Sequence, residues 1–242
     1  MARGIRAPIG DRPTRRPAVQ GIARTGLPLV AAADRIIGLM WILGSVLVNG
    51  SAPSILGRTD LRTTEWAVTH RTPTLNTLSH LSSMVADTSV ALVVTAVAVV
   101  GFRLWLGRWR ESLVVVVAIV GELSVITAIV HRARPAVPQL DQAPPTSSFP
   151  SGHTGAAVAL YVCLAVILLR NAKPRWLAAG LAVLGCVIPI VVAASRVYRG
   201  MHYLTDVSAG ALASGIWLTV VLVTLLPTAT ANRVDRTEGA RT

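Results

Sequence analysis

Residues 207–226, VSAGALASGIWLTVVLVTLL, contain no charged side chain in twenty consecutive positions. A helix of about 20 apolar residues crosses the hydrocarbon core of a bilayer, so this stretch predicts a membrane-spanning helix. Four other runs have a similar composition, and a further run is interrupted by Asp34 and Arg35. They cover residues 83–106, 112–130, 155–169 and 176–194, and the interrupted first span lies within 27–56. We therefore expect an all-α, polytopic membrane protein whose six transmembrane helices form a bundle.

The composition excludes most soluble classes of protein. Of the 242 residues, 52% are hydrophobic and 14% are charged, whereas soluble domains contain about 25% charged residues. Extensive disorder is excluded as well, because it requires low hydrophobicity. The net charge of +12 does not predict nucleic-acid binding, since the basic residues are scattered between apolar runs. The expected partner is therefore a membrane bilayer, with no nucleic acid, and the sequence leaves the oligomeric state open.

The distribution of basic residues predicts the orientation in the membrane. Residues 1–26 are expected to form a disordered basic cytoplasmic tail, residues 27–226 the membrane domain, and residues 227–242 a second cytoplasmic tail. With six spans, 15 Lys and Arg residues fall on the side of the termini and seven on the other side. Because cytoplasmic loops are enriched in Lys and Arg, both termini should lie in the cytoplasm. The protein is thus expected in the cell inner (plasma) membrane, with the loops after spans one, three and five facing outward.

Polar side chains gather in three clusters at the outer ends of the predicted spans. The first comprises Arg132, Arg134 and Pro135, and the second is residues 150–153, Pro-Ser-Gly-His. The third comprises Ser195, Arg196, His202 and Asp206. Side chains at adjacent helix ends share one pocket when the spans pack as a bundle, so we expect the three clusters to form a single site facing outward.

Two histidines in these clusters suit phosphoryl transfer. His202 and Asp206 are four residues apart and are expected on one face of the first turn of the last span. A carboxylate can orient a neutral imidazole, which then attacks phosphorus and forms a phosphohistidine. His153 is the expected general acid, because an ordinary imidazole gains and loses a proton near neutral pH.

The remaining residues of the clusters suit phosphate binding. Arg134 and Arg196 are expected to contact the equatorial oxygens of the transferred group with planar guanidinium forks. Ser151 and Gly152 precede a predicted helix, where free backbone N–H groups favour an anion. The outward-facing acids Asp60, Glu65, Asp87, Asp141 and Asp206 are not clustered in sequence as Mg²⁺ sites require, so no metal and no cofactor is expected.

The three clusters resemble the three motifs of the type 2 phosphatidic acid phosphatase superfamily. The matching segments are Arg134-Pro135, Pro150-Ser151-Gly152-His153, and Ser195-Arg196 followed by five residues, His202, three residues and Asp206. The resemblance implies a metal-independent lipid phosphatase, of the undecaprenyl diphosphatase or phosphatidic acid phosphatase kind, which removes the terminal phosphate of a lipid phosphate or diphosphate. It implies His202 as nucleophile, Asp206 as its partner and His153 as acid. It also implies phosphate binding by Arg134, Arg196, Ser151 and Gly152.

One position departs from the family pattern. The first motif usually begins with Lys seven residues before the arginine of Arg-Pro, and this chain has Thr127 there. On a continuing helix Thr127, His131 and Arg134 would share a face. We hypothesise from this spacing that His131 or Arg132 replaces part of the missing charge.

Three other functions stay open at the level of sequence. The phosphohistidine could pass its phosphoryl group to an acceptor other than water, which would make the protein a phosphotransferase. A non-catalytic lipid transporter would use Glu122, Asp34 and Arg35 along a path through the bundle. A scaffold protein would have lost activity together with the motif lysine.

Overall fold

The computed structural model describes residues 16–49, 55–122 and 130–226, with side chains from Gly26 onward except at Glu122. The described residues form helices joined by turns and one long loop, without β-strands. The helices, in chain order, are α1 (Arg16–Asn49), α2 (Ile55–Thr69), α3 (Pro73–Met84), α4 (Thr88–Leu106), α5 (Trp109–Glu122), α6 (Gly152–Ala157), the π-helical turn η2 (Val158–Val162), α7 (Cys163–Asn171), α8 (Arg175–Tyr198) and α9 (Leu204–Leu225). The predicted all-α class is confirmed.

Five segments of the described chain are long and apolar enough to cross a membrane. They are Gly26–Asn49, Thr88–Leu106, Gly152–Asn171, Arg175–Tyr198 and Leu204–Leu225. The remaining predicted span, 112–130, corresponds to α5, of which 14 residues are described. Its predicted continuation over 123–129 lies outside the described residues.

Two predicted boundaries differ most from the structure. Helix α1 begins at Arg16, whereas the sequence predicted a tail up to residue 26. Pro17 lies in the first turn of α1, where proline is tolerated, and the next proline inside the helix is Pro28. The span predicted to start at Ser83 begins at Thr88 instead, because α3 ends at Met84 and a new helix begins after Asp87, its N-cap residue.

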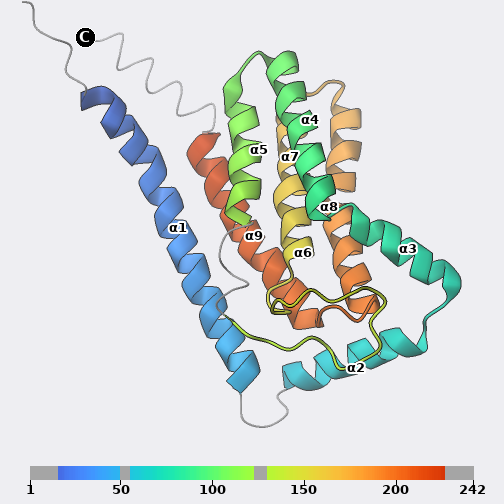
Figure 1. Cartoon of the computed structure of the whole chain (residues 1–242). Helices are drawn as coiled ribbons and strands as arrows, with labels where there is room; N and C mark the ends of the chain where they lie inside the picture. Colours follow the sequence, from blue (N-terminus) through green and yellow to red (C-terminus); the bar gives the residue numbers. More distant parts are fainter. Residues whose placement is uncertain (1–15, 50–54, 123–129, 227–242) are drawn as a thin grey trace, which may run out of the picture.

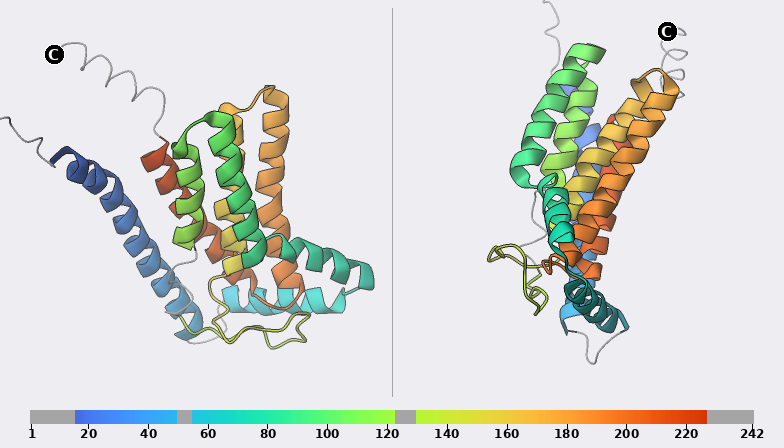
Figure 2. Two further views of the ribbon diagram at one scale, coloured as in Figure 1. Left: turned by 45° about the horizontal axis from the view of Figure 1, so that its top comes forward. Right: turned by 90° about the vertical axis from the view of Figure 1, so that its right-hand side faces the viewer.

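The bundle is assembled from helix pairs. Figures 1 and 2 show α4 beside α5 and α7 beside α8, while α1 leans along α9. The core between these helices contains five fully buried side chains: Met40 of α1, Val114 of α5, Leu160 and Ile167 of the segment η2–α7, and Val221 of α9. Small side chains permit close contact: a Cβ added at Gly185 of α8 would lie 2.7 Å from the carbonyl oxygen of Tyr161.

The outer surface of the bundle is apolar. Leu104 is 79% exposed, Trp176 74% and Val223 71%, and they come from three different helices. Large apolar surfaces of this kind are rare on soluble monomers. Lipid chains cover them without cost, which agrees with a multi-pass membrane protein.

One end of the bundle is closed by α2, α3 and the loop 130–151. Figure 1 shows these segments at the end where α8 stops and where α6 and α9 start. The sequence left residues 57–82 open between an amphipathic helix and a plain loop, and the structure has two helices there. They are separated at Thr72, whose side chain accepts from the amide of Leu75, and Pro73 occupies the first turn of α3. We call this end of the molecule the site end.

Candidate active site

His202 lies in the tight connection between α8 and α9. Helix α8 ends at Tyr198, and Gly200 adopts φ +72°, a left-handed conformation that glycine tolerates best. The chain then reverses, and Tyr203 is the N-cap of α9. The sequence placed His202 on the first turn of this helix, but it precedes the helix by two residues. Its side chain is nevertheless buried, with 4% exposure.

Backbone contacts fix the tautomer of His202. Its Nδ1 lies 2.7 Å from the carbonyl oxygen of Ser148, which can only accept, so Nδ1 carries the proton. The other nitrogen, Nε2, then has a free electron pair, and Nη1 of Arg134 lies 3.4 Å from it. Burial lowers the pKa of His202 more than the nearby Asp206 carboxylate raises it. The ring is therefore neutral and nucleophilic at neutral pH.

Asp206 contacts His202 less closely than the sequence suggested. Its Oδ2 lies 3.7 Å from Nδ1 of His202, too far for a hydrogen bond. The same oxygen accepts from the amide of Tyr203 at 2.9 Å, and Oδ1 forms an ion pair with Arg132. Asp206 is fully buried. Its charge therefore lies close to the ring of His202 without a hydrogen bond to it, while the Ser148 carbonyl accepts from Nδ1.

Arg132 is held outside the cavity by two carboxylates. Its guanidinium pairs with Asp206 and, at 2.8 Å, with Asp60 of α2. Asp60 also accepts from the amide of Thr205 at 2.9 Å, so this network joins α2, the loop 130–151 and the start of α9. The hypothesis that Arg132 takes the place of the motif lysine at the phosphate finds no support in this position.

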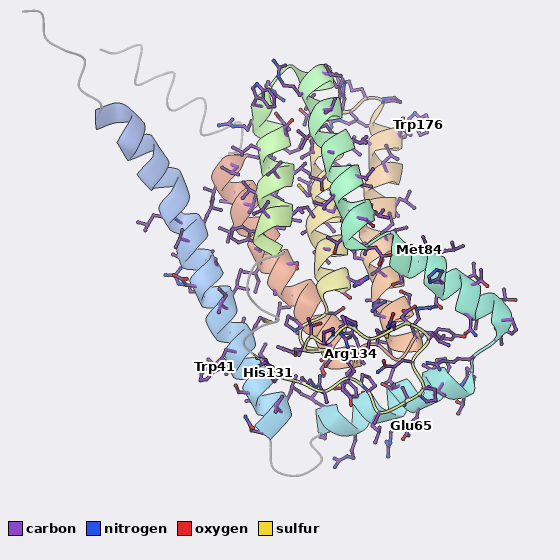
Figure 3. The ribbon with its side chains drawn as sticks, in the orientation of Figure 1. Trp41, Glu65, Met84, His131, Arg134 and Trp176 are labelled. Carbon is purple, nitrogen blue, oxygen red and sulfur yellow. The ribbon has the colours of Figure 1, made fainter. Side chains whose placement is uncertain are left out.

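The structure does not support a role for His131 in replacing the motif lysine either. His131 is exposed and does not line the cavity. Figure 3 shows it towards α1, whereas Arg134 lies nearer the centre of the site end. The helix expected to continue through His131 is absent, since residues 130–134 are not helical. The residue that follows them, Pro135, disfavours helical backbone at Arg134. Thr127 lies outside the described residues.

A cavity of about 360 Å³ collects residues from all three sequence clusters. Of the residues chosen from sequence it is lined by Arg134, Gly152, His153, Arg196 and His202. Ser151, Asp206, Arg132 and His131 do not line it. Positions separated by up to 68 residues, as in the contact between Arg134 and His202, thus meet in one place.

Each of the two cavity arginines, Arg134 and Arg196, has an N–H donor without a hydrogen-bond partner. Arg134 donates from Nη1 to the carbonyl oxygen of Met201 at 2.8 Å, and Arg196 donates from Nη1 to Oγ of Ser83 at 2.8 Å. Within the described part of the chain, four buried side-chain nitrogen or oxygen atoms lack a hydrogen-bond partner, and two of them are the Nε atoms of Arg134 and Arg196. Buried N–H groups are rarely left unpaired, so these donors are suited to an anion that enters the cavity.

The turn before α6 is held tightly in place. The amide of Ser151 donates to the carbonyl oxygen of Asp206 at 3.0 Å, so it is not free for phosphate as the sequence suggested. The Oγ of Ser151 accepts from Thr154. Gly210 of α9 packs directly on this turn, since a Cβ added there would lie 2.5 Å from the carbonyl oxygen of Ser151. Gly152 remains the residue of this turn that lines the cavity.

Two acids, Asp87 and Asp141, contact basic residues of the site, although the sequence suggested no role for them other than metal binding. Asp87, the N-cap of α4, lies 2.8 Å from Nε2 of His153 through its Oδ1. Asp141 lies 3.2 Å from Nη1 of Arg196 and pairs with Arg199, whose hydrogen bonds hold the pKa of Asp141 below its ordinary value. Neither acid stands at a motif spacing, so no sequence signal identifies its role. Among the described residues, no group of three or more His, Cys, Asp or Glu is arranged to hold a metal ion.

Known proteins resemble this chain in sequence or in fold. An undecaprenyl-diphosphatase from Sulfolobus acidocaldarius is 32% identical over 97 residues, which is 40% of this chain and 42% of the relative. The match thus spans less than half of that relative. The crystal structure of a transmembrane PAP2 type phosphatidylglycerolphosphate phosphatase from Bacillus subtilis superimposes with a TM-score of 0.68 at 23% identity, covering 76% of this chain and 92% of that one. Aquifex aeolicus LpxE gives a TM-score of 0.51 at 20% identity, covering 69% and 94%.

The family is identified by the part of the chain that carries the site. The model of the PAP2 superfamily matches residues 109–228, which comprise α5 to α9 and all three polar clusters. From the site geometry, the fold and this match it follows that the chain belongs to the PAP2 superfamily.

Proposed function

We propose that this protein is a membrane lipid phosphatase that hydrolyses the terminal phosphate of a lipid phosphate or diphosphate through a phosphohistidine at His202. The observation that carries the proposal is the 360 Å³ cavity, in which a neutral imidazole and two arginines with unpaired Nε donors meet a second imidazole. Such a constellation binds a tetrahedral anion and supplies both a nucleophile and an acid.

The first half-reaction forms the covalent intermediate. Nε2 of His202 attacks phosphorus with its free electron pair while the bond from phosphorus to the leaving oxygen breaks. Protonated His153 gives its proton to that oxygen, so the lipid product leaves as an alcohol or as a lipid monophosphate. Arg134 and Arg196 stabilise the charge on the equatorial oxygens. The charge of Asp206 at 3.7 Å stabilises the positive ring of His202.

The second half-reaction restores the protein. Neutral His153 takes a proton from water as the water oxygen attacks phosphorus. The bond between phosphorus and Nε2 breaks, and its electrons return to the ring of His202. Inorganic phosphate leaves, and His153 is again protonated for the next turnover.

The lipid nature of the substrate is supported by where the cavity lies and by one relative. The cavity is at one end of a bundle with an apolar outer surface, where a head group can enter while its tails stay in the bilayer. The relative that is 32% identical is named an undecaprenyl-diphosphatase, which favours polyprenyl diphosphates beside glycerolipid phosphates such as phosphatidic acid.

The site end is proposed to face away from the cytoplasm. The turns at the opposite end are rich in basic residues: Arg103, Arg108, Arg110, Arg170, Lys173 and Arg175. At the site end, in contrast, four arginines form ion pairs or hydrogen bonds within the protein, so their positions do not indicate the orientation in the membrane. They are Arg132, Arg134, Arg196 and Arg199. The positive-inside rule then places the basic turns and both termini in the cytoplasm.

Phosphate release by the purified full-length protein in detergent tests the function. The panel comprises phosphatidic acid, a polyprenyl phosphate and a polyprenyl diphosphate. We expect turnover by the wild-type protein and by Glu65→Gln, an exposed α2 residue outside the cavity, and loss of at least about a thousandfold in His202→Ala. Equal turnover by His202→Ala and the wild type would refute the proposal.

A further inference from the structure

Asp87 stands at a helix N-terminus but does not cap the helix with its side chain. It is the N-cap of α4, a position where aspartate usually accepts from the amides of the first turn. Here no such bond is formed, and the carboxylate instead lies 2.8 Å from Nε2 of His153 on α6. The side chain is therefore turned away from its ordinary local partner towards a residue 66 positions later.

The pairing occurs inside the candidate active site. Asp87 and His153 both line the cavity, together with Arg134, Arg196 and His202. His153 faces Asp87 from α4, Arg196 from α8 and His202 from the α8–α9 connection, while Asp141 and His80 lie further around the wall. Asp87 is the anion within hydrogen-bond distance of this histidine, and the nearest charges from α8 are cationic.

We propose that Asp87 is the positioning residue of His153, holding the imidazole through Nε2 so that Nδ1 delivers the proton to the leaving oxygen. The assignment rests on the proposed function and names a participant that the three sequence motifs do not contain. A carboxylate accepts only, so Nε2 carries a proton in this pair, and Nδ1 is the ring nitrogen left for the substrate.

The proton transfer balances in both directions. When the bond to the leaving oxygen breaks, the proton on Nδ1 of His153 moves to that oxygen, and the ring becomes neutral while keeping its Nε2–H on Asp87. When water attacks the phosphohistidine, Nδ1 accepts a proton from the water and the ring is cationic again. The carboxylate of Asp87 keeps its hydrogen bond with Nε2–H of His153 in both half-reactions and stabilises the cationic ring through its charge.

The variant Asp87→Asn separates this role from helix capping. Asparagine caps helices as well as aspartate does and has nearly the same size, so it preserves α4 while removing the charge. The measured quantity is kcat for two substrates whose leaving groups differ in basicity. Dioctanoyl phosphatidic acid leaves a strongly basic alkoxide that needs the acid, whereas p-nitrophenyl phosphate leaves a weakly basic phenolate that hardly needs it.

We expect Asp87→Asn to lower kcat for dioctanoyl phosphatidic acid by at least about tenfold and to leave kcat for p-nitrophenyl phosphate within about threefold of the wild type. KM should stay unchanged, and Asp87→Asn should add no further loss in a His153→Ala background. Glu65→Gln is the matched control for removing an acidic charge at the site end.

Three results would overturn the assignment. They are an unchanged kcat for phosphatidic acid, an equal loss for both leaving groups, or a further loss when Asp87→Asn is added to His153→Ala. If these occur while the wild type hydrolyses lipid phosphates and His202→Ala does not, only the role of Asp87 fails. Absence of phosphate release by the wild-type protein would refute the proposed function itself.

Discussion

His202 donates its Nδ1 proton to the carbonyl oxygen of Ser148, at 2.7 Å, and not to the carboxylate of Asp206, at 3.7 Å. The loop that carries Ser148 thus fixes the tautomer of the proposed nucleophile, and the Asp206 carboxylate places a negative charge further away. This division of roles separates two effects that a single Asp–His hydrogen bond would combine.

The variant Asp206→Asn tests this division. Since the Ser148 carbonyl keeps Nδ1 protonated, the same tautomer of His202 should remain, while the stabilisation of its positive ring and the ion pair between Asp206 and Arg132 are lost. We expect kcat to fall by about tenfold to a hundredfold, less than the roughly 10⁴-fold loss seen where the carboxylate itself sets the tautomer. A steady-state assay on folded, monodisperse protein measures the loss, and one of 10⁴-fold or more would show that Asp206 determines the tautomer.

The protonation of His202 should occur below its ordinary pH range. Burial lowers the pKa of this histidine below the ordinary 6.5, so the neutral nucleophile persists as the pH falls and is lost only in more acidic solution. NMR titration of ¹⁵N-histidine-labelled protein in detergent, with His202→Gln for assignment, measures the pKa directly. A midpoint at or above 6.5 would contradict the buried, neutral ring. Over that acidic window the unfolded chain binds more protons at this residue, so its contribution makes unfolding easier as the pH drops.

Gly210→Ala should damage the site, and Gly215→Ala on the same helix should not. The added Cβ would lie 2.5 Å from the Ser151 carbonyl oxygen in the first case and meets nothing within 4 Å in the second. We expect Gly210→Ala to cost about 1–3 kcal/mol of stability by overpacking and to lower kcat by shifting the turn that carries His153. Gly215→Ala should be neutral or stabilising by up to about 1 kcal/mol. Thermal unfolding and turnover of both variants are the measurements, and equal behaviour would refute the packing argument.

Arg199 should prove to be structural, although it neighbours the site. It is buried and donates to Asp141 and to the Ser79 hydroxyl, so it joins the end of α8 to α3 and to the loop 130–151. Without Arg199, the carboxylate of Asp141 would pair with Arg196 alone. It should then neutralise part of the positive charge that Arg196 is proposed to offer to phosphate. We expect Arg199→Ala to lower the unfolding temperature and to raise KM several-fold, while Arg62→Ala, an exposed control on α2, changes neither. An unchanged KM in Arg199→Ala would show that the Asp141 contact does not affect phosphate binding.

Removal of metal ions should leave turnover intact. In the proposed reaction, imidazoles and guanidiniums supply the nucleophile, the acid and the positive charge. Activity measured with and without EDTA should therefore agree within experimental error. Loss of activity with EDTA and its recovery with Mg²⁺ would contradict the reaction as written.

Hydropathy was sufficient to predict the helical membrane fold, because each span depends mainly on its own residues. Motif spacing likewise predicted that His153, His202, Arg134 and Arg196 would share a cavity. The contacts around them were not predictable, because they depend on how the chain turns between helices. The amide of Ser151 is taken by Asp206, Arg132 is drawn to Asp60, and the Ser148 carbonyl holds His202.

The two ends of α3 illustrate the same limit. Thr72-Pro73 is a recognisable helix start, yet nothing in the local sequence shows that the helix stops at Met84 to let Asp87 reach His153. Such a position is set by tertiary packing, and α3 packs against α8.

The stereochemical course at phosphorus tests the central claim most directly. A thiophosphate monoester made chiral at phosphorus with ¹⁶O and ¹⁸O is hydrolysed by the wild-type protein in water enriched in ¹⁷O, and the configuration of the inorganic thiophosphate product is determined. Attack by His202 followed by attack of water involves two in-line displacements, so we predict overall retention of configuration. Inversion would mean that water attacks the substrate directly, and it would contradict the phosphohistidine at His202.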